Sequence, residues 1–315
     1  MPVAPGTSTV TTLARLAGGL VVVTFGLLVV GASVRVHGAG LACPDWPLCF
    51  GEVVPTLDVG VAFEFGHRVL AGGVSLGFLG LLGGIYRVRA LLPAWLLGAA
   101  GLALGTLGLQ VLLGGLTVLE LLAEWTVTSH LLAGNLFCLL LLVVALGLRE
   151  AGDPVVRSPV PRFARGAAVA LAVGVLAQLV LGGLVSASHA GLVCGAMWPE
   201  CTEGAWFPTF EGLIGLHLAH RLVAYGLVGL TAFVAWTVRS SPRAWAAGTR
   251  VVAAIGVQAG IGIANVLTAL PVEVTLLHTA GAAAVVLATT GLHWELWRAP
   301  AESPAAVRAL ALGVA

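Results

Sequence analysis

Eight long apolar runs, separated by short polar segments, dominate the chain. They cover residues 16–34, 62–86, 95–117, 126–148, 166–186, 214–237, 246–268 and 274–297. Runs of about 20 apolar residues match the roughly 30 Å hydrocarbon core of a bilayer. A backbone inside lipid must satisfy its own hydrogen bonds, so each run is predicted to be a transmembrane helix. The pattern therefore predicts an all-α membrane protein with eight transmembrane helices.

Composition supports this class and excludes two others. Of the 315 residues, 59% are hydrophobic and only 9% are charged, which is too apolar for a soluble domain. The net charge of +1 comes without any basic cluster, so nothing in the sequence indicates binding to nucleic acid.

Arginine positions predict the orientation, since every basic residue of the chain is an arginine. Basic residues favour the cytoplasmic side of a membrane. With both termini cytoplasmic, twelve of the fifteen fall on the inner side: Arg15, Arg87, Arg89, Arg149, Arg157, Arg162, Arg165, Arg239, Arg243, Arg250, Arg298 and Arg308. Arg35, Arg68 and Arg221 then lie outside. We expect a multi-pass protein of the cell membrane.

A polar inner segment from residue 149 to 165, with three prolines, separates two sets of four runs. It predicts an N-terminal half, residues 1–150, and a C-terminal half, residues 151–315. Short motifs recur in both halves, among them Gly40-Leu-Ala-Cys43 with Gly191-Leu-Val-Cys194, and Gln110-Val-Leu-Leu-Gly114 with Gln258-Ala-Gly-Ile-Gly262. Such an internal repeat predicts two pseudo-symmetric four-helix bundles. Because each repeat has an even number of helices, the symmetry axis would run along the membrane normal.

Four of the five cysteines lie in two long loops, residues 35–61 and 187–213, which the orientation places on the extracytoplasmic side. Cys43 and Cys49 enclose one turn-rich segment, and Cys194 and Cys201 enclose another. That side of a membrane permits disulfides, so we expect one disulfide in each loop. Structural zinc is a poorer interpretation because each loop offers only two thiols. Cys138 lies alone in the fourth run and is expected to be a packing residue.

Four histidines lie at matching places in the second, fourth, sixth and eighth runs: His67, His130, His220 and His278. Each is expected about four to six residues past the start of its helix, within roughly 10 Å of the outer surface. Histidine is rare in lipid and normally faces the bundle interior. Two imidazoles at one depth in each half predict two haem sites, with iron held between facing helices. The competing interpretations are helix–helix hydrogen bonds and a copper or zinc site.

Charged neighbours accompany the first histidine of each half. Arg68 and Arg221 follow His67 and His220 directly, and a guanidinium pairs well with a haem propionate; snorkelling to the surface is the alternative. Three residues before these histidines, on the same helical face, stand Glu64 in one half and His217 in the other. A carboxylate beside a haem is a candidate general acid or base. The alternative is an acid that the dipole of the helix N-terminus favours.

Taken together, these motifs resemble the haem A synthases, membrane enzymes of cytochrome oxidase assembly. The resemblance covers residues 15–297, and it rests on the segment from Gly40 to Cys49, Glu64-x-x-His67-Arg68, His130, His220-Arg221 and His278. It implies that haem O is the substrate and that a ring methyl becomes a formyl group with O2 as oxidant. It further implies a substrate haem at His67 and His130, with Glu64 catalytic, and a resident haem b at His220 and His278.

The same resemblance implies a haem O synthase upstream and a quinol or other reductant as electron donor, and the glycine-rich helix faces permit a homo-oligomer. Because O2 would have to displace a ligand, either His67 or His130 is expected to be labile, or O2 acts without binding the iron. Two other functions fit the residues: a di-haem cytochrome b that takes electrons from quinol, and a haem transporter or chaperone.

Overall fold

The computed structural model describes residues 5–300, and the prediction of an all-α membrane protein is confirmed within them. Eight helices are long and apolar enough to cross a membrane. They are α1 (Pro5–Val36), α2 (Val59–Arg87), α3 (Ala94–Leu119), α4 (Glu124–Gly152), α5 (Arg162–Ala187), α6 (Gly212–Thr237), α7 (Pro242–Leu267) and α8 (Val272–Arg298). Two 3-10 turns, Arg89–Leu91 and Ala190–Leu192, follow α2 and α5. Every predicted run lies inside one of the eight helices, except that the last residue of the seventh run, Thr268, lies one residue beyond the end of α7.

Local sequence explains where several helices begin. Asp58 caps α2 by accepting a hydrogen bond from the Val61 N–H at 2.8 Å. Prolines stand directly before α3, α5 and α8, and Pro242 is the first residue of α7. Proline suits these places because the first helical N–H groups have no partner within the helix.

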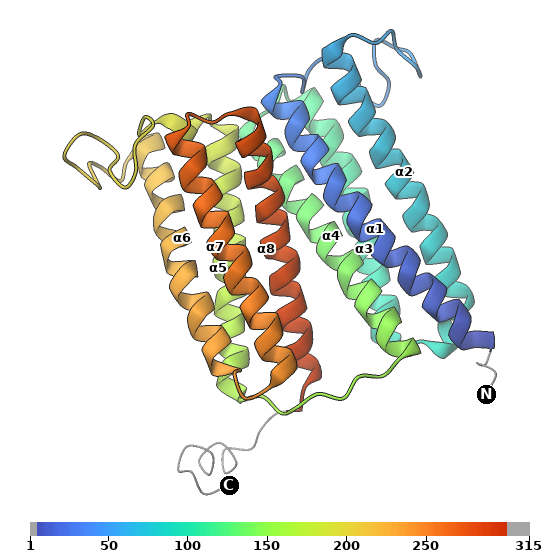
Figure 1. The fold of residues 1–315 in the computed structure, drawn as a ribbon. Helices are drawn as coiled ribbons and strands as arrows, with labels where there is room; N and C mark the ends of the chain where they lie inside the picture. Colours follow the sequence, from blue (N-terminus) through green and yellow to red (C-terminus); the bar gives the residue numbers. More distant parts are fainter. Residues whose placement is uncertain (1–4, 301–315) are drawn as a thin grey trace, which may run out of the picture.

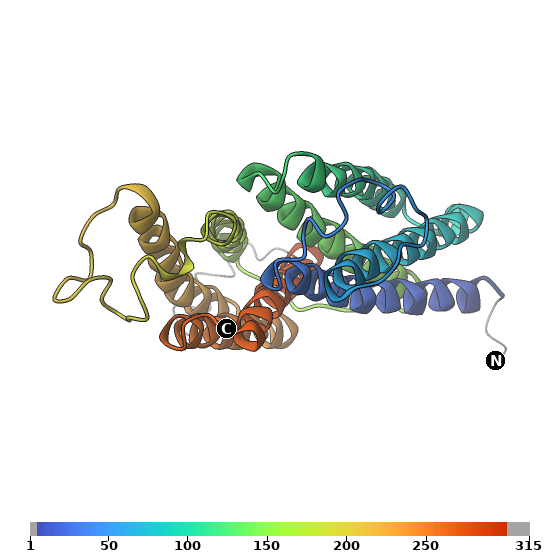
Figure 2. The same ribbon diagram turned by 90° about the horizontal axis from the view of Figure 1, so that it is seen from above.

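The helices form two groups of four that lie side by side, α1–α4 and α5–α8 (Figure 1). Each group has its own hydrophobic core, one around Phe78, Leu96 and Leu141 and the other around Leu171, Val234 and Leu292. Seen along the helices, α1 and α4 of the first group and α5 and α8 of the second meet at the centre (Figure 2). Two cores within one continuous structure agree with two four-helix halves; a symmetry axis between them stays a prediction.

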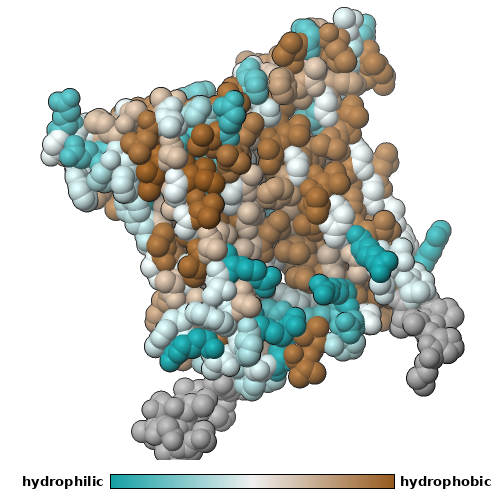
Figure 3. Space-filling model, viewed as in Figure 1, coloured by the Kyte–Doolittle hydropathy of each residue, from teal (hydrophilic) through white to brown (hydrophobic). Residues whose placement is uncertain are grey.

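Polarity along the helix axes follows the membrane pattern. Hydrophobic side chains cover the middle of the face shown in Figure 3, and hydrophilic side chains gather toward its two ends. The first and last described residues lie at the same end of the molecule (Figure 1). That this end is cytoplasmic remains the prediction from arginine positions.

An ion-pair network ties the two halves together at this end. Glu150, at the end of α4, accepts from Arg157 of the linker and from Arg298 of α8 at 3.1 Å. Glu295 of α8 accepts from Arg157 at 2.8 Å and from Arg243 of α7 at 3.1 Å. Since both carboxylates share Arg157, the linker is fixed to both halves.

Candidate functional site

Two of the four histidines of interest, His67 and His220, lie deeper in their helices than the sequence predicts. His67 and His220 stand eight residues after the first residues of α2 and α6, Val59 and Gly212. His130 and His278 stand six residues into α4 and α8. The expected four to six residues were wrong for the first pair because α2 begins three residues earlier than its apolar run and α6 two. At 1.5 Å per residue the depths are about 12 and 9 Å, and the pattern repeats in both halves.

The histidines of each half interact with each other. The charge of His67 acts on the imidazole of His130, and that of His278 acts on the imidazole of His220. The Nδ1 atoms of His67, His130 and His220 are buried without a hydrogen-bond partner. A buried polar atom without a partner needs an explanation. A ligand between the two imidazoles of each half would supply one.

Each imidazole packs against a glycine of the preceding helix. A Cβ atom on that glycine would lie 2.9 to 3.0 Å from the Cε1 atom of the ring, closer than side chains tolerate. The four pairs are Gly31 with His67, Gly114 with His130, Gly182 with His220, and Gly262 with His278. Glycine is therefore the residue that leaves each ring its place inside the bundle.

Three of the four imidazoles also contact a glutamine. The Nε2 atom of Gln110 lies 3.3 Å from Nε2 of His130, and that of Gln178 lies 3.3 Å from Nε2 of His220. Gln258 approaches Nδ1 of His278 to 3.1 Å. Within residues 5–300, no group of three histidine, cysteine or acidic side chains forms a cluster of metal-ligand type. Each half thus offers imidazoles in pairs, which is what an iron porphyrin uses.

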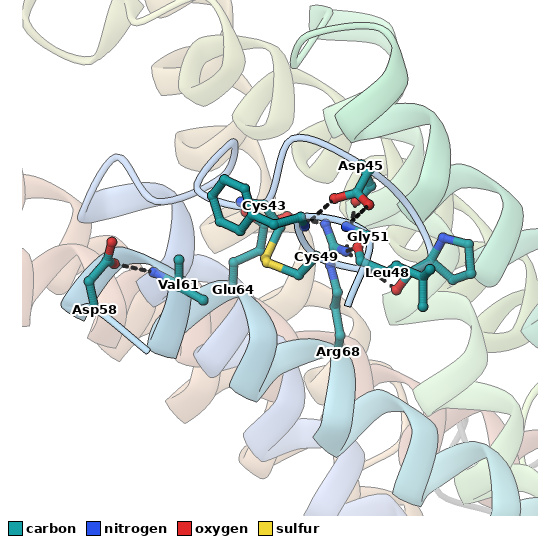
Figure 4. The surroundings of a disulfide bond; sticks show 11 residues. Cys43, Asp45, Leu48, Cys49, Gly51, Asp58, Val61, Glu64 and Arg68 are labelled. Carbon is teal, nitrogen blue, oxygen red and sulfur yellow. Dashed lines mark hydrogen bonds and ion pairs between the residues drawn. A yellow bond between two sulfur atoms is a disulfide. The ribbon is translucent and has the colours of Figure 1, made fainter. Parts of the chain in front are cut away.

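Glu64 is buried, but polar groups surround its carboxylate (Figure 4). One oxygen accepts from Arg68 at 2.5 Å, and the other accepts from the backbone N–H of Cys43 at 2.8 Å. The same arginine donates to the carbonyl oxygens of Asp45 at 2.9 Å and Leu48 at 2.5 Å. The carboxylate of Glu64 therefore belongs to an ion pair that is attached to the cysteine loop.

In the second half, Arg221 makes the corresponding contacts with the other cysteine loop. Its guanidinium donates to the carbonyl oxygens of Met197 at 2.9 Å and Glu200 at 3.2 Å. His217 is buried at the place of Glu64, and its Nδ1 lies 2.9 Å from the carbonyl oxygen of Ala190. The arginines thus hold loops in both halves, whereas only the first half places a carboxylate beside them.

Both predicted disulfides are present. Cys43 is bonded to Cys49 and Cys194 to Cys201, and all four residues are buried. Cys138 is a buried free cysteine among apolar side chains of the first core, in agreement with a packing role.

Asp45 organises the first cysteine loop. Its carboxylate accepts from the backbone N–H groups of Gly51 at 2.8 Å and Phe50 at 2.7 Å. These hydrogen bonds hold the pKa of Asp45 below its usual value, and the bond from Gly51 has the largest effect. The nearby charge of Arg68 lowers the pKa in the same direction. The carbonyl of Asp45 meanwhile receives Arg68, so the loop, the arginine and Glu64 form one connected unit.

Part of the histidine environment does not follow from the repeat between the two halves. That repeat pairs Gln110 with Gln258 but does not include Gln178. A comparison of the helix pairs α1–α2, α3–α4, α5–α6 and α7–α8 finds it, because the residue four positions before the glycine lies one turn earlier on the same helical face. That residue is glutamine at positions 110, 178 and 258 and leucine at position 27.

Comparison with known proteins adds independent evidence. Residues 14–290 match the model of a family described as "Cytochrome oxidase assembly protein". A protein of Shewanella oneidensis named "Heme A synthase" is 31% identical, over 88% of this chain and 95% of its own length. Proteins of the same name from Methylobacterium nodulans and Chelativorans are 28% and 29% identical, over 85% and 89% of this chain and 87% and 89% of their own lengths.

Proposed function

Because this chain belongs to the family of cytochrome oxidase assembly proteins, we propose that it is a membrane oxidoreductase that converts haem O to haem A. The relatives named "Heme A synthase" match it over nearly their whole length. The single structural observation that carries the proposal is the pair of neighbouring histidines in each half, three of which (His67, His130 and His220) have a buried Nδ1 atom without a hydrogen-bond partner.

We assign the substrate to the N-terminal half. There His67 and His130 would hold the iron of haem O, and Glu64 lies one helical turn before His67 on the same face. In the C-terminal half the equivalent residue is His217, and Nδ1 of its imidazole is hydrogen-bonded to the carbonyl oxygen of Ala190. A half that does acid–base chemistry needs a group that exchanges protons, so the half with the carboxylate is the better candidate.

The C-terminal half fits a resident haem. His220 and His278 lie within electrostatic range of each other, each packs against a glycine, and each is contacted by a glutamine. When bound there, haem b would supply single electrons for the oxidation. The role of the chain is to hold the two imidazoles in place and to exclude water from between the helices.

Glu64 is the proposed catalytic residue. Two hydroxylations of a ring methyl by O2 give a carbon that bears two hydroxyl groups, and loss of one water then leaves the formyl group. Glu64 would accept the hydroxyl proton at a carboxylate oxygen and return it to the departing hydroxide. Arg68 and the Cys43 N–H fix the carboxylate, and each oxygen keeps a further lone pair for the substrate.

Arg68 and Arg221 remain candidates for the haem propionates. A guanidinium has five N–H donors, and the contacts with loop carbonyls leave some of them free for a carboxylate. In this proposal each arginine joins a cysteine loop to the edge of a haem. The two loops would then cover the outer ends of the two haem sites, on the extracytoplasmic side.

Partners follow from the chemistry. A haem O synthase would deliver an apolar substrate within the membrane, and a quinol or another reductant would supply electrons. A homo-oligomer is compatible with the small-residue faces of the helices.

Haem content tests the function. The full-length protein, expressed in a host without its own enzyme, is purified, and its haems are extracted and identified by mass. We expect haem A or a hydroxylated intermediate together with haem b. His220→Ala should remove haem b, whereas His67→Ala should remove the modified haem. Haem b alone in both halves would instead support a di-haem cytochrome b, and unmodified haem O alone would support a transporter or chaperone.

A further inference from the structure

The helices form four consecutive pairs, α1–α2, α3–α4, α5–α6 and α7–α8. In each pair the histidine of the second helix packs against the same arrangement of residues on the first. A glycine receives the ring, and the residue one turn earlier lies on the same helical face. In α3, α5 and α7 this earlier residue is a glutamine whose amide reaches a ring nitrogen. In α1 it is Leu27, whose side chain cannot form a hydrogen bond.

The three glutamine amides are only half satisfied. The Oε1 atoms of Gln110, Gln178 and Gln258 are buried without a hydrogen-bond partner. Rotation about the last bond of the side chain exchanges the amide oxygen and nitrogen. The same glutamine can therefore donate to a bare ring nitrogen or accept from a ring N–H. A histidine that binds metal through one nitrogen carries a proton on the other, and an acceptor beside that N–H fixes the ring.

His67 lacks this support. Its Nδ1 is buried and unpartnered, and on the α1 side the ring lies against Gly31, one helical turn after Leu27. No hydrogen bond to Nδ1 therefore restrains the rotation of the ring about the Cβ–Cγ bond. His130, the other imidazole of the same half, does have its glutamine.

We propose that the glutamines of α3, α5 and α7 are positioning residues for three of the imidazoles, and that Leu27 leaves His67 as the one imidazole able to turn away from a bound haem. This inference rests on the proposed function. A resident haem requires two fixed ligands, and the C-terminal half has them. A substrate haem must arrive, expose its iron and leave as product, and one fixed and one releasable ligand serve that purpose.

Introducing the missing amide tests the inference. Haem b is added as a probe to the full-length protein in detergent, with wild type, Leu27→Gln and Leu27→Met compared. Release is followed by transfer to excess apomyoglobin, and the spin state of the ferric iron by electron paramagnetic resonance. We expect Leu27→Gln to slow release from the N-terminal half by roughly 10-fold and to raise its low-spin fraction. Leu27→Met keeps the volume without an amide and should behave as wild type.

Glutamine removal gives a second test, which does not depend on Leu27→Gln folding. Gln110→Leu should speed release from the N-terminal half by roughly 10-fold. Gln178→Leu should leave that rate unchanged but shift the midpoint potential and the low-spin signal of the haem in the C-terminal half. A role in packing alone would change thermal stability without moving the potential.

The outcomes separate the two proposals. If wild type binds haem in the N-terminal half, but Leu27→Gln and Gln110→Leu release it at the wild-type rate, the glutamine inference is wrong and the function stands. If His67→Ala and His130→Ala leave the haem content of wild type unchanged, no haem is held there and the proposed function itself fails.

Discussion

The two halves are built from similar helix pairs, but the packing between the second and third helices of each half differs. In the C-terminal half α6 packs along α7, whereas α2 and α3 of the N-terminal half hardly touch. An apolar groove of about 570 Å³ lies between α2 and α3, lined among others by Leu79, Leu82, Tyr86, Leu97, Ala100 and Leu104. The half with the tighter helix packing is also the half in which both imidazoles have glutamine partners.

A second difference concerns the residue one turn before the first histidine. Glu64 is joined to Arg68 and to the backbone of the cysteine loop, whereas His217 meets a single carbonyl oxygen. Both residues are buried at equivalent places. Under the proposed function, one scaffold would hold a haem in both halves, and one substituted position would equip a single half for proton transfer.

The largest expected effect comes from removing the charge of Glu64. Glu64→Gln keeps the shape but cannot accept a proton, and general acid–base groups contribute roughly 100-fold or more. Haem A formation per mole of protein should fall by about that factor, with hydroxylated haem accumulating. His217→Gln is the matched control and should retain most of the activity. If both variants lost haem A formation equally, the two halves would not differ in the role of this residue.

Removing the disulfides should have the second-largest effect. A cross-link that closes a loop of this size stabilises a protein by about 2 kcal/mol, so the double variants Cys43→Ser/Cys49→Ser and Cys194→Ser/Cys201→Ser should lose similar amounts in thermal unfolding. Only the first should also lower haem A formation per folded molecule, because the Cys43 N–H holds Glu64. If the second variant lost as much activity per folded molecule, the link from the first loop to Glu64 would be unimportant.

A structural feature can be predicted from the sequence when a local pattern or the membrane determines it, and not when it depends on tertiary contacts. Lipid fixes the eight helices, so apolar runs were sufficient to find them. Their ends were less predictable: α1 begins at Pro5 instead of residue 16, because nothing between these positions prevents a helix from continuing beyond the bilayer core. The histidine pairs followed from matching spacings. The loop contacts of Arg68 did not, since they depend on where a folded loop places its carbonyl oxygens.

Local stability should also distinguish the halves. Fewer packing contacts lower the free energy of local opening, and α2 has a poorly packed neighbour on its α3 side where α6 has α7. Amide hydrogens in the middle of α2 should therefore exchange with deuterium faster than those of α6. Mass spectrometry of the protein in lipid nanodiscs measures both in one sample. Equal protection of the two helices would mean that the groove does not loosen the N-terminal half.

The smallest expected effect is a pH response of the first cysteine loop through Asp45. Asp45 accepts from Gly51 and Phe50, and its pKa is lowered in the folded loop. A lowered pKa stabilises the loop at pH values above the unfolded value of about 3.9, and this contribution is lost as the pH falls through the folded pKa. Protection of the Phe50 and Gly51 amides, corrected for intrinsic exchange, should therefore hold at pH 5 and decline below pH 4.

Asp45→Asn removes the titrating group and should abolish this decline. The second loop has Met197 before its Trp-Pro pair where the first has Asp45. Apart from the Gly204 N–H, which donates to Glu200 at 3.3 Å, its amides should therefore show no comparable change over the same range. A parallel loss of protection in both loops would assign the response to general acid unfolding. A decline confined to the first loop would mean that the carboxylate of Asp45 keeps in place the carbonyls that receive Arg68, and through Arg68 the position of Glu64.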